Sequence, residues 1–353
     1  DITFRVFNTT TDSFRPQSLN SETWSSDSNN SASTSTQKQM EIRTTHSLTF
    51  VPYFKNTDHS FSAMVRGEIV SSERKGQNQS VYGLPSGTYT STALPGTING
   101  FGTSAGQSHS VNASFQAHYA YKGKYIVQFT SRTDGSTAFG DSRRWGTFPS
   151  VSLRWNVSDE NFIRENAPWI TMLSIRPSWG LGGYAPGGDG LYYSKYTAGD
   201  SYLNTGTIYP SNIRLNKLQW EQSQQWNLGF DIGLFNDKLT FDVNLYSKKT
   251  EKMLMNGRKI PSSSGFSSLQ HSNEGSMLNR GWEINLNANR FIEIGDFSVT
   301  GNLNFSDNYN ELLEMDATIL DGYNKEFNYD NRQWLTYIQL NNAFGSIYGF
   351  KYL

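Results

Sequence analysis

The chain has 353 residues, a formal net charge of −1 and no cysteine. The missing cysteine excludes disulfides and thiol chemistry, and the balanced charge without a basic stripe argues against a nucleic-acid-binding surface. No apolar run reaches the roughly 18 residues of a transmembrane helix, although a membrane-barrel strand needs only about ten alternating residues. The 19 Tyr, 22 Phe and 9 Trp, among abundant Gly, Ser, Thr and Asn, favour β-strands joined by polar turns.

Period-two alternation predicts roughly ten strands along the chain. Two weaker segments come first, at 48–54 and 61–69. The clearest segment is 111–121, where Phe115 lies on an apolar face and His118 on a polar one. Further segments with this alternation follow in chain order at 125–132, 151–157, 173–179, 226–232, 239–245, 282–288 and 297–305.

The lengths of the connections give a second signal. Short links are expected at 55–60, 122–124, 158–169, 235–238 and 290–296. Long ones are expected at 72–110, 133–149, 180–223, 249–280 and from 307 onward. Because short and long links alternate, all the long loops lie at one end, as in bacterial outer-membrane barrels with short periplasmic turns.

The two faces of the expected strands differ in chemistry. One face carries aliphatic and aromatic side chains with essentially no charge. The other carries amides, hydroxyls and the charged residues Arg132, Arg154, Arg176, Asp231, Asp242 and Glu283. Lipid satisfies neither open backbone groups nor charges, so this pattern predicts an all-β, antiparallel transmembrane barrel with a polar interior. The alternative is a soluble β-sandwich with its apolar face in a core.

Several motifs in the chain are distinctive. R-T-D-G-S-T-A-F-G at 132–140 precedes R-W-G-T-F-P-S-V-S-L-R-W at 144–155. Further blocks are S-W-G-L-G-G at 178–183, N-E-G-S-M-L-N-R-G-W-E-I at 273–284 and G-S-I-Y-G-F at 345–350. Together they resemble the SusC/RagA family of TonB-dependent outer-membrane transporters of Bacteroidota. The chain departs from that pattern at Thr137-Ala138, where the family often has Ser-Arg.

The resemblance implies an outer-membrane protein with an N-terminal plug inside a 22-stranded barrel, the size class of plugged transporters. On this interpretation residues 1–353 are part of the barrel, and the plug and the last strands lie outside the chain. The implied partners are a SusD-like surface lipoprotein, TonB-ExbB-ExbD acting through an N-terminal region, a glycan or peptide ligand, and outer-membrane lipid.

Three functions are compatible with the sequence. The first is TonB-dependent import of bulky nutrients, either glycans or peptides. The second is a SusC-like barrel that serves as a structural subunit of a larger outer-membrane complex. The third is a soluble β-sandwich adhesin or lectin.

Candidate ligand or partner contacts lie in the expected long loops. A tyrosine offers a flat apolar face and a polar tip, which suit sugar rings or peptides. The candidates are Tyr184, Tyr192, Tyr193, Tyr196, Tyr202, Tyr209, Arg143, Arg144 and Trp145. The alternatives are loop packing for the tyrosines and a structural role for the last three.

No catalytic residue, metal site or cofactor is expected. The five histidines are scattered and form no H-x-x-x-H or H-E-x-x-H pattern. Asp159 and Glu160 are better explained by a helix cap than by acid–base catalysis. The sequence therefore gives no indication of an enzyme.

Overall fold

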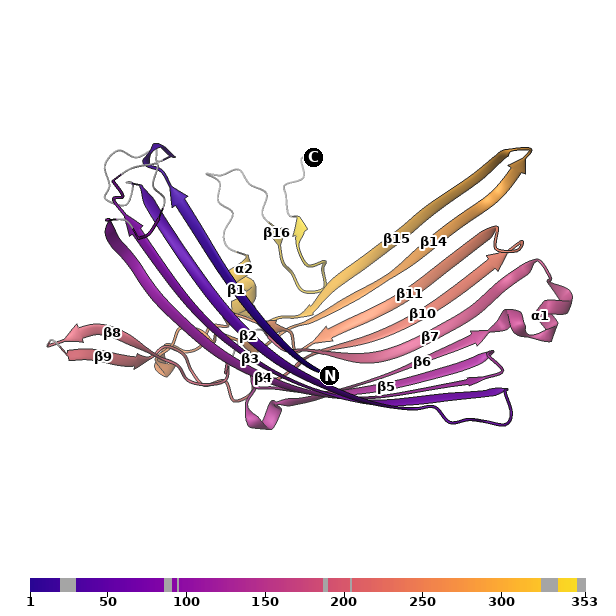
Figure 1. Ribbon diagram of the computed structural model, residues 1–353, viewed down its shortest axis with the longest axis horizontal. Helices are drawn as coiled ribbons and strands as arrows, with labels where there is room; N and C mark the ends of the chain where they lie inside the picture. The colour runs from indigo at the N-terminus through magenta and orange to yellow at the C-terminus, as the bar shows by residue number, and fades with distance from the viewer. Residues whose placement is uncertain are drawn as a thin grey trace. The chain divides into compact units, whose positions relative to one another are not determined.

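The computed structural model describes residues 1–19, 30–85, 91–93, 95–186, 190–203, 205–324 and 336–347. Its main element is an 11-stranded sheet with edge strands β1 and β15, in which the strands follow one another in chain order (Figure 1). The pairs are antiparallel, as in β5 with β6 and β10 with β11. The strands are β1 (Ile2–Arg15), β2 (Ser31–Phe50), β3 (His59–Tyr82), β4 (Thr97–Tyr121), β5 (Tyr125–Ser136), β6 (Trp145–Asn156), β7 (Ile170–Tyr184), β10 (Glu221–Leu234), β11 (Leu239–Glu251), β14 (Ser276–Ile294) and β15 (Phe297–Glu314).

Short elements occupy the connections. The two-stranded hairpins are β8 (Tyr196–Tyr202) with β9 (Thr205–Pro210), β12 (Leu254–Met255) with β13 (Ser272–Asn273), and β16 (Thr336–Tyr337) with β17 (Ser346–Ile347). The helices are α1 (Asn161–Asn166) and α2 (Ala317–Tyr323), with 3-10 turns η1 (Gln17–Leu19), η3 (Asp141–Arg143), η4 (Val157–Asp159) and η5 (Ser262–Ser264). In the described ranges, no helix has both the length and the apolar character needed to cross a membrane.

The predicted strands are confirmed. Nine of the ten alternating segments correspond to β3–β7, β10, β11, β14 and β15. The segment expected at 48–54 overlaps β2 only at 48–50, and neither the rest of β2 nor β1 was predicted. Strand ends differ more: β3 and β4 extend far into the expected 72–110 link, and β5 and β6 leave only residues 137–144 between them. That connection is shorter than 157–169, so the lengths do not alternate as strictly as the sequence predicts.

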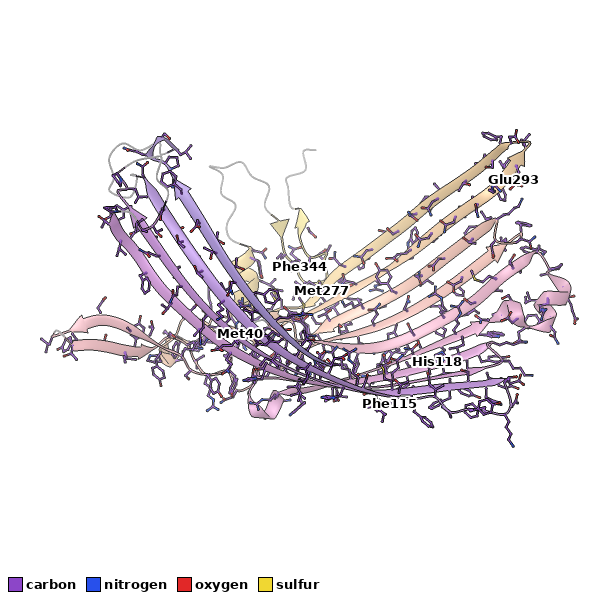
Figure 2. The ribbon with its side chains drawn as sticks, in the orientation of Figure 1. Met40, Phe115, His118, Met277, Glu293 and Phe344 are labelled. Atoms are coloured by element: carbon purple, nitrogen blue, oxygen red, sulfur yellow. The ribbon has the colours of Figure 1, made fainter. Side chains whose placement is uncertain are left out.

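The two faces of the sheet follow the predicted alternation. On the apolar face, Phe115 is 40% and Trp155 is 38% exposed, and Phe241 is half-buried. None of these three side chains lies in a dry protein core, which is what a β-sandwich requires. Figure 2 labels Phe115 and His118 on β4, and their side chains leave the strand on opposite sides.

Aromatic rings gather on the apolar side near the short connections. Ring contacts run from His59 to Tyr121 at 5.1 Å, from Tyr121 to Tyr125 at 6.4 Å and from Tyr125 to Trp155 at 6.4 Å. Trp169 stacks on Phe235 at 6.1 Å beside the next two short connections. Such a row is typical of the aromatic girdle at a membrane interface.

The expected helix cap at 159–160 is wrong. Glu160 occupies the N-cap position of α1, but its side chain makes no cap hydrogen bond. It accepts instead from the Tyr125 hydroxyl at 2.6 Å and from Lys124 Nζ at 3.2 Å. The Tyr125 hydrogen bond lowers the pKa of the Glu160 carboxyl, so this carboxylate joins the turn to β5.

The chain divides into two units, Asp1–His46 with Gly67–Val111, and Ser47–Arg66 with Asn112–Leu353. In the first unit, β1 pairs with β2 from Ile2–Thr44 to Arg15–Ser31. A small core contains Ala32, Val81 and Leu84, with Phe14 packed against it. The functional candidates below all belong to the second unit.

Candidate functional site at the loop end of the sheet

A buried aromatic cluster holds together the connections that follow β5 and β7. Phe139 is 0% exposed, and its ring lies 5.0 Å from Trp220, which also meets Phe148 edge-on at 5.6 Å. The Trp220 indole N–H donates to the Arg144 carbonyl at 3.1 Å. The cluster consists of Ala138, Phe139, Phe148, Leu191, Tyr192, Leu215, Leu218 and Trp220. We call it the loop core.

Two glycines make room for the central ring of the loop core. A Cβ atom at either Gly146 or Gly183 would overlap the Phe148 ring. Gly146 and Phe148 belong to the W-G-T-F-P-S block, and Gly183 ends the S-W-G-L-G-G block. The W-G-T-F-P-S block leads the chain back into the sheet, since β6 begins at Trp145. These motifs therefore build the loop core.

Two asparagines connect the loop core to the 252–275 connection. Asn273 Nδ2 donates to the carbonyls of Gln219 at 2.7 Å and Lys252 at 3.0 Å, and its Oδ1 accepts from the Gln219 N–H at 2.9 Å. Asn212, which is buried, donates to the Tyr193 carbonyl and to Gln270 Oε1, both at 3.0 Å. Asn273 begins the N-E-G-S-M-L-N-R-G-W-E-I block, whereas nothing in the local pattern singled out Asn212.

The 252–275 connection is fixed in turn against α2. Arg258 pairs with Glu274 and lies 3.2 Å from Asp316. Asp316 caps α2 by accepting from the Thr318 N–H at 2.9 Å. The Thr318 hydroxyl, which also donates to this carboxylate, lowers the pKa of Asp316. The long connections of this unit thus form one packed and hydrogen-bonded layer.

The predicted contact residues are dispersed in this layer. Tyr192 is 4% exposed, within the loop core, and its ring lies 4.0 Å from that of Tyr193. The burial of Tyr192 favours loop packing, the alternative to ligand or partner contact. The exposed candidates are Tyr184, Tyr193, Tyr196, Tyr202, Tyr209, Arg143 and Trp145, and Arg144 is partly buried.

The β8–β9 hairpin carries three of the exposed tyrosines. Tyr196 pairs with Pro210, and Tyr209 pairs with Thr197. Neighbouring register positions point to opposite sides, so Tyr196 and Tyr209 lie on opposite faces of the hairpin. The structure therefore does not bring the candidate tyrosines into one binding surface.

An ion-pair network crosses the polar face of the sheet, the face on which the sequence places these charged residues. Arg176 Nη2 lies 2.6 Å from Asp231 and 3.3 Å from Asp242, and Arg154 lies 3.4 Å from Asp231. The fully buried Ser174 hydroxyl donates to Asp231 at 2.7 Å. The network joins β6, β7, β10 and β11.

Between the ion-pair network and the loop core, the polar face is hollowed. One hollow of about 370 Å³ is lined mainly by hydroxyl, amide and glycine positions, among them Ser150, Ser178, Gly182 and Ser223. A second, of about 290 Å³, includes Asn244, Tyr246, Lys248 and Asn279. Gln225 and Asn227 line both. Glu283 also lines the second hollow, so Lys248 and Glu283 give it one charge of each sign. This surface can donate hydrogen bonds to a polar ligand and accept them from it.

In the described part of the chain, no three His, Asp or Glu side chains form a group that could hold a metal ion. His271 lies in the 252–275 connection, where its Nδ1 is 2.6 Å from Asn256 Oδ1. Burial lowers the pKa of His271.

Comparison with known proteins agrees with this architecture. The model of the TonB dependent receptor-like β-barrel family matches residues 2–352. The TonB-dependent receptor SusC of Bacteroides thetaiotaomicron is 31% identical over 277 residues, covering 75% of this chain and 27% of that protein. A TonB-dependent receptor of Formosa agariphila is 34% identical over 260 residues, covering 72% of this chain and 23% of that protein. The chain thus spans about a quarter of the length of these relatives.

Solved structures show the same fold. The RagAB peptide importer in its closed-closed state matches with a TM-score of 0.78 at 22% identity, over 97% of this chain and 36% of that chain. The RagAB peptide transporter matches with a TM-score of 0.76 at 21% identity, over 90% and 35%. In an outer-membrane barrel the apolar face meets lipid and the polar face lines the interior. The chain belongs to the TonB-dependent receptor family, with the SusC/RagA transporters, and forms part of an outer-membrane β-barrel.

Proposed function

We propose that the full-length protein imports bulky polar nutrients, glycans or peptides, in a TonB-dependent manner, and that this chain supplies part of its barrel wall. The observation that carries the proposal is the pair of hollows on the polar face. They are lined mainly by amides and hydroxyls, with Lys248 and Glu283 in the second, and these groups can bind sugar hydroxyls or peptide groups. RagAB, which shares the fold, is a peptide importer.

A SusD-like lipoprotein is the proposed partner at the loop end. The β8–β9 hairpin presents tyrosines on both faces, together with the exposed Leu203 and Ile208. An isolated two-stranded hairpin is marginally stable in water, so a covering partner would stabilise it. TonB-ExbB-ExbD is the proposed energy source, acting through another part of the protein.

Uptake of labelled oligosaccharides and oligopeptides by cells with and without TonB tests the import function. We expect uptake to require TonB and to fall when Gln225 and Asn227 are replaced by leucine, because the hollows lose their hydrogen-bonding groups. Gln116→Leu, on the polar face of β4 outside both hollows, is the matched control. Uptake at the same rate without TonB contradicts the proposal.

A structural subunit of a larger outer-membrane complex is the second candidate. The observation that favours it is the same exposed hairpin, since such a surface suits any protein partner. Stoichiometric co-purification with other outer-membrane proteins, combined with nutrient uptake that is unchanged after deletion, would favour this role over import.

A further inference from the structure

The second hollow of the polar face contains two charges of opposite sign, Lys248 and Glu283. Both residues are exposed, and in the described ranges neither side chain has a hydrogen-bond or ion-pair partner. The charged side chains of the ion-pair network, in contrast, neutralise one another. Lys248 and Glu283 are therefore available to a ligand that enters the hollow.

The two charges lie on the same face of the sheet, well separated along the strands. In the register of β11 and β14, Lys248 pairs with Asn279 and Asn244 pairs with Glu283. Positions 244 and 248 share a face, as do residues paired directly across two strands. Four positions at ~3.3 Å each place the two charged residues roughly 13 Å apart along the strands. Because β11 ends at Glu251, where the long 252–275 connection begins, Lys248 is the charge nearer the loops.

Amide side chains line the hollow beside these charges. They belong to Gln225, Asn227, Asn244 and Asn279. In the part of the chain that the structure describes, the side chains of Gln225, Asn227 and Asn279 have no hydrogen-bond partner. An amide has both donors and an acceptor, so it can pair with the N–H and the carbonyl of a peptide group. The same amides also suit sugar hydroxyls, so they do not distinguish the two classes of nutrient by themselves.

The two free charges do distinguish these classes. A neutral glycan offers hydroxyls but no charge, whereas a peptide with free ends has an ammonium group at one end and a carboxylate at the other. An extended peptide of about four residues spans roughly 13 Å at ~3.3 Å per residue, which matches the separation of Lys248 and Glu283. The hollow is therefore complementary in charge and length to a short zwitterionic peptide.

We propose that the second hollow binds short peptides by their free ends, with the carboxylate at Lys248 and the ammonium group at Glu283. The backbone groups between the ends pair with Gln225, Asn227 and Asn279. The amino end points towards the short turns, which are periplasmic in an outer-membrane barrel. The inference rests on the proposed import function, for which it names peptides, and not neutral glycans, as the substrate class.

Equilibrium dialysis of the purified full-length protein against uncharged tetrapeptides tests this proposal. The tetrapeptides are random sequences of alanine, glycine, serine and threonine, prepared with both ends free, with an acetylated amino end or with an amidated carboxyl end. Wild-type protein should bind the free-ended peptides about fivefold more tightly than either blocked form, the upper end for a solvent-exposed ion pair. Lys248→Met should bind free-ended and amidated peptides equally, and Glu283→Gln should bind free-ended and acetylated peptides equally.

Each variant keeps the discrimination that depends on the other charge, which separates loss of one contact from a general weakening. Lys249→Met is the matched control, because Lys249 is the next residue of β11, faces the other side and pairs with Glu251. Its preferences should equal those of the wild type. Heat-modifiable gel mobility confirms that every variant has a folded barrel before binding is compared.

Two results overturn the proposal. One is wild-type protein that binds free-ended and blocked tetrapeptides equally or binds none of them. The other is a variant whose affinity for all peptide forms falls by the same factor. Cellotetraose, a neutral tetrasaccharide, serves as the competing ligand. If it binds and the peptides do not, TonB-dependent uptake of that sugar would still support import, while the assignment to peptides would be wrong.

Discussion

The connection between β7 and β10 contains two regions of opposite character. In one region, Leu191, Tyr192, Leu215, Leu218 and Trp220 are buried in the loop core together with Phe139 and Phe148. Residues 196–210 form the β8–β9 hairpin, in which Tyr202 is 71% exposed. Tyrosines only a few residues apart thus differ in burial, because contacts with distant motifs decide which of them are buried.

Removal of the Phe148 ring should have the largest effect on the difference in stability between the loop core and the β8–β9 hairpin. Phe148→Ala leaves a cavity between Gly146, Gly183 and Trp220, at a cost of about 3 kcal/mol in the local opening free energy. Hydrogen exchange of residues 215–220 should accelerate by about a hundredfold, while that of 196–210 stays unchanged. Equal acceleration in both regions would mean that the hairpin depends on the loop core.

Loss of the Asn273 side chain should have the next largest effect. Asn273→Ala removes three hydrogen bonds and leaves the Gln219 and Lys252 backbone groups unpaired, which costs about 2 kcal/mol. Asn273→Asp keeps the acceptor and should lie between alanine and wild type. Hydrogen exchange should accelerate in both the 215–220 and 252–275 segments, and a change in only one would refute the bridging role.

Capping of α2 contributes a smaller amount. Asp316→Ala removes the hydrogen bond to the Thr318 N–H and the pairing with Arg258, for a cost of about 1 kcal/mol. Asp316→Asn retains a capping side chain and serves as the control. Exchange of the α2 amides measures the effect, and identical rates for both variants would show that the cap is unimportant.

Acidification should destabilise the 252–275 connection through protonation of His271. Burial lowers the pKa of this ring, so the folded protein favours the neutral form. The folded state therefore has its full stability above the ordinary histidine pKa of about 6.5. It loses stability as the pH falls below that value, because the unfolded chain binds the proton more readily. Exchange of the 252–275 amides, corrected for intrinsic rates, should rise between pH 7.5 and 5.5 in the wild type and less in His271→Gln. Greater protection at pH 5.5 would contradict this sign.

Truncation in the hairpin should have the smallest effect on stability. Tyr202→Ala should change the free energy of unfolding by less than about 0.5 kcal/mol, because its side chain is exposed. If the hairpin contacts a partner, binding of the purified lipoprotein should weaken while exchange in the loop core stays at the wild-type rate. An altered loop core would show that the two regions are coupled.

The sequence predicted the membrane-spanning parts of the strands better than their ends. Alternation is strong where one face meets lipid, as from Phe115 to Tyr121. It fades in the polar half of β1, where Asn8, Thr9, Thr10 and Thr11 follow one another. Where both faces of a strand meet water, neither face needs apolar side chains, so apolar and polar residues need not alternate. For that reason β1, residues 31–47 of β2 and the outer parts of β3 and β4 were missed.

The candidate site was only partly predictable for a different reason. The polar-face charges were found because each lies in a strand with a clear register. The roles of Asn212 and Asn273 depend on contacts with residues more than fifty positions away. A single sequence contains no local signal for such contacts. The glycines of the W-G-T-F-P-S and S-W-G-L-G-G blocks were visible as a pattern, but the sequence did not show that the Phe148 ring packs against them.

The orientation of the sheet can be measured directly because this chain has no cysteine. Single cysteines placed along β5 and β6 in the membrane-embedded protein can be spin-labelled and tested for collision with oxygen or a water-soluble nickel complex. We predict that positions 127, 129, 153 and 155 favour oxygen, and that 128, 130, 152 and 154 favour the nickel complex. Protection of the first group from both reagents, as in a dry protein core, would contradict the barrel account.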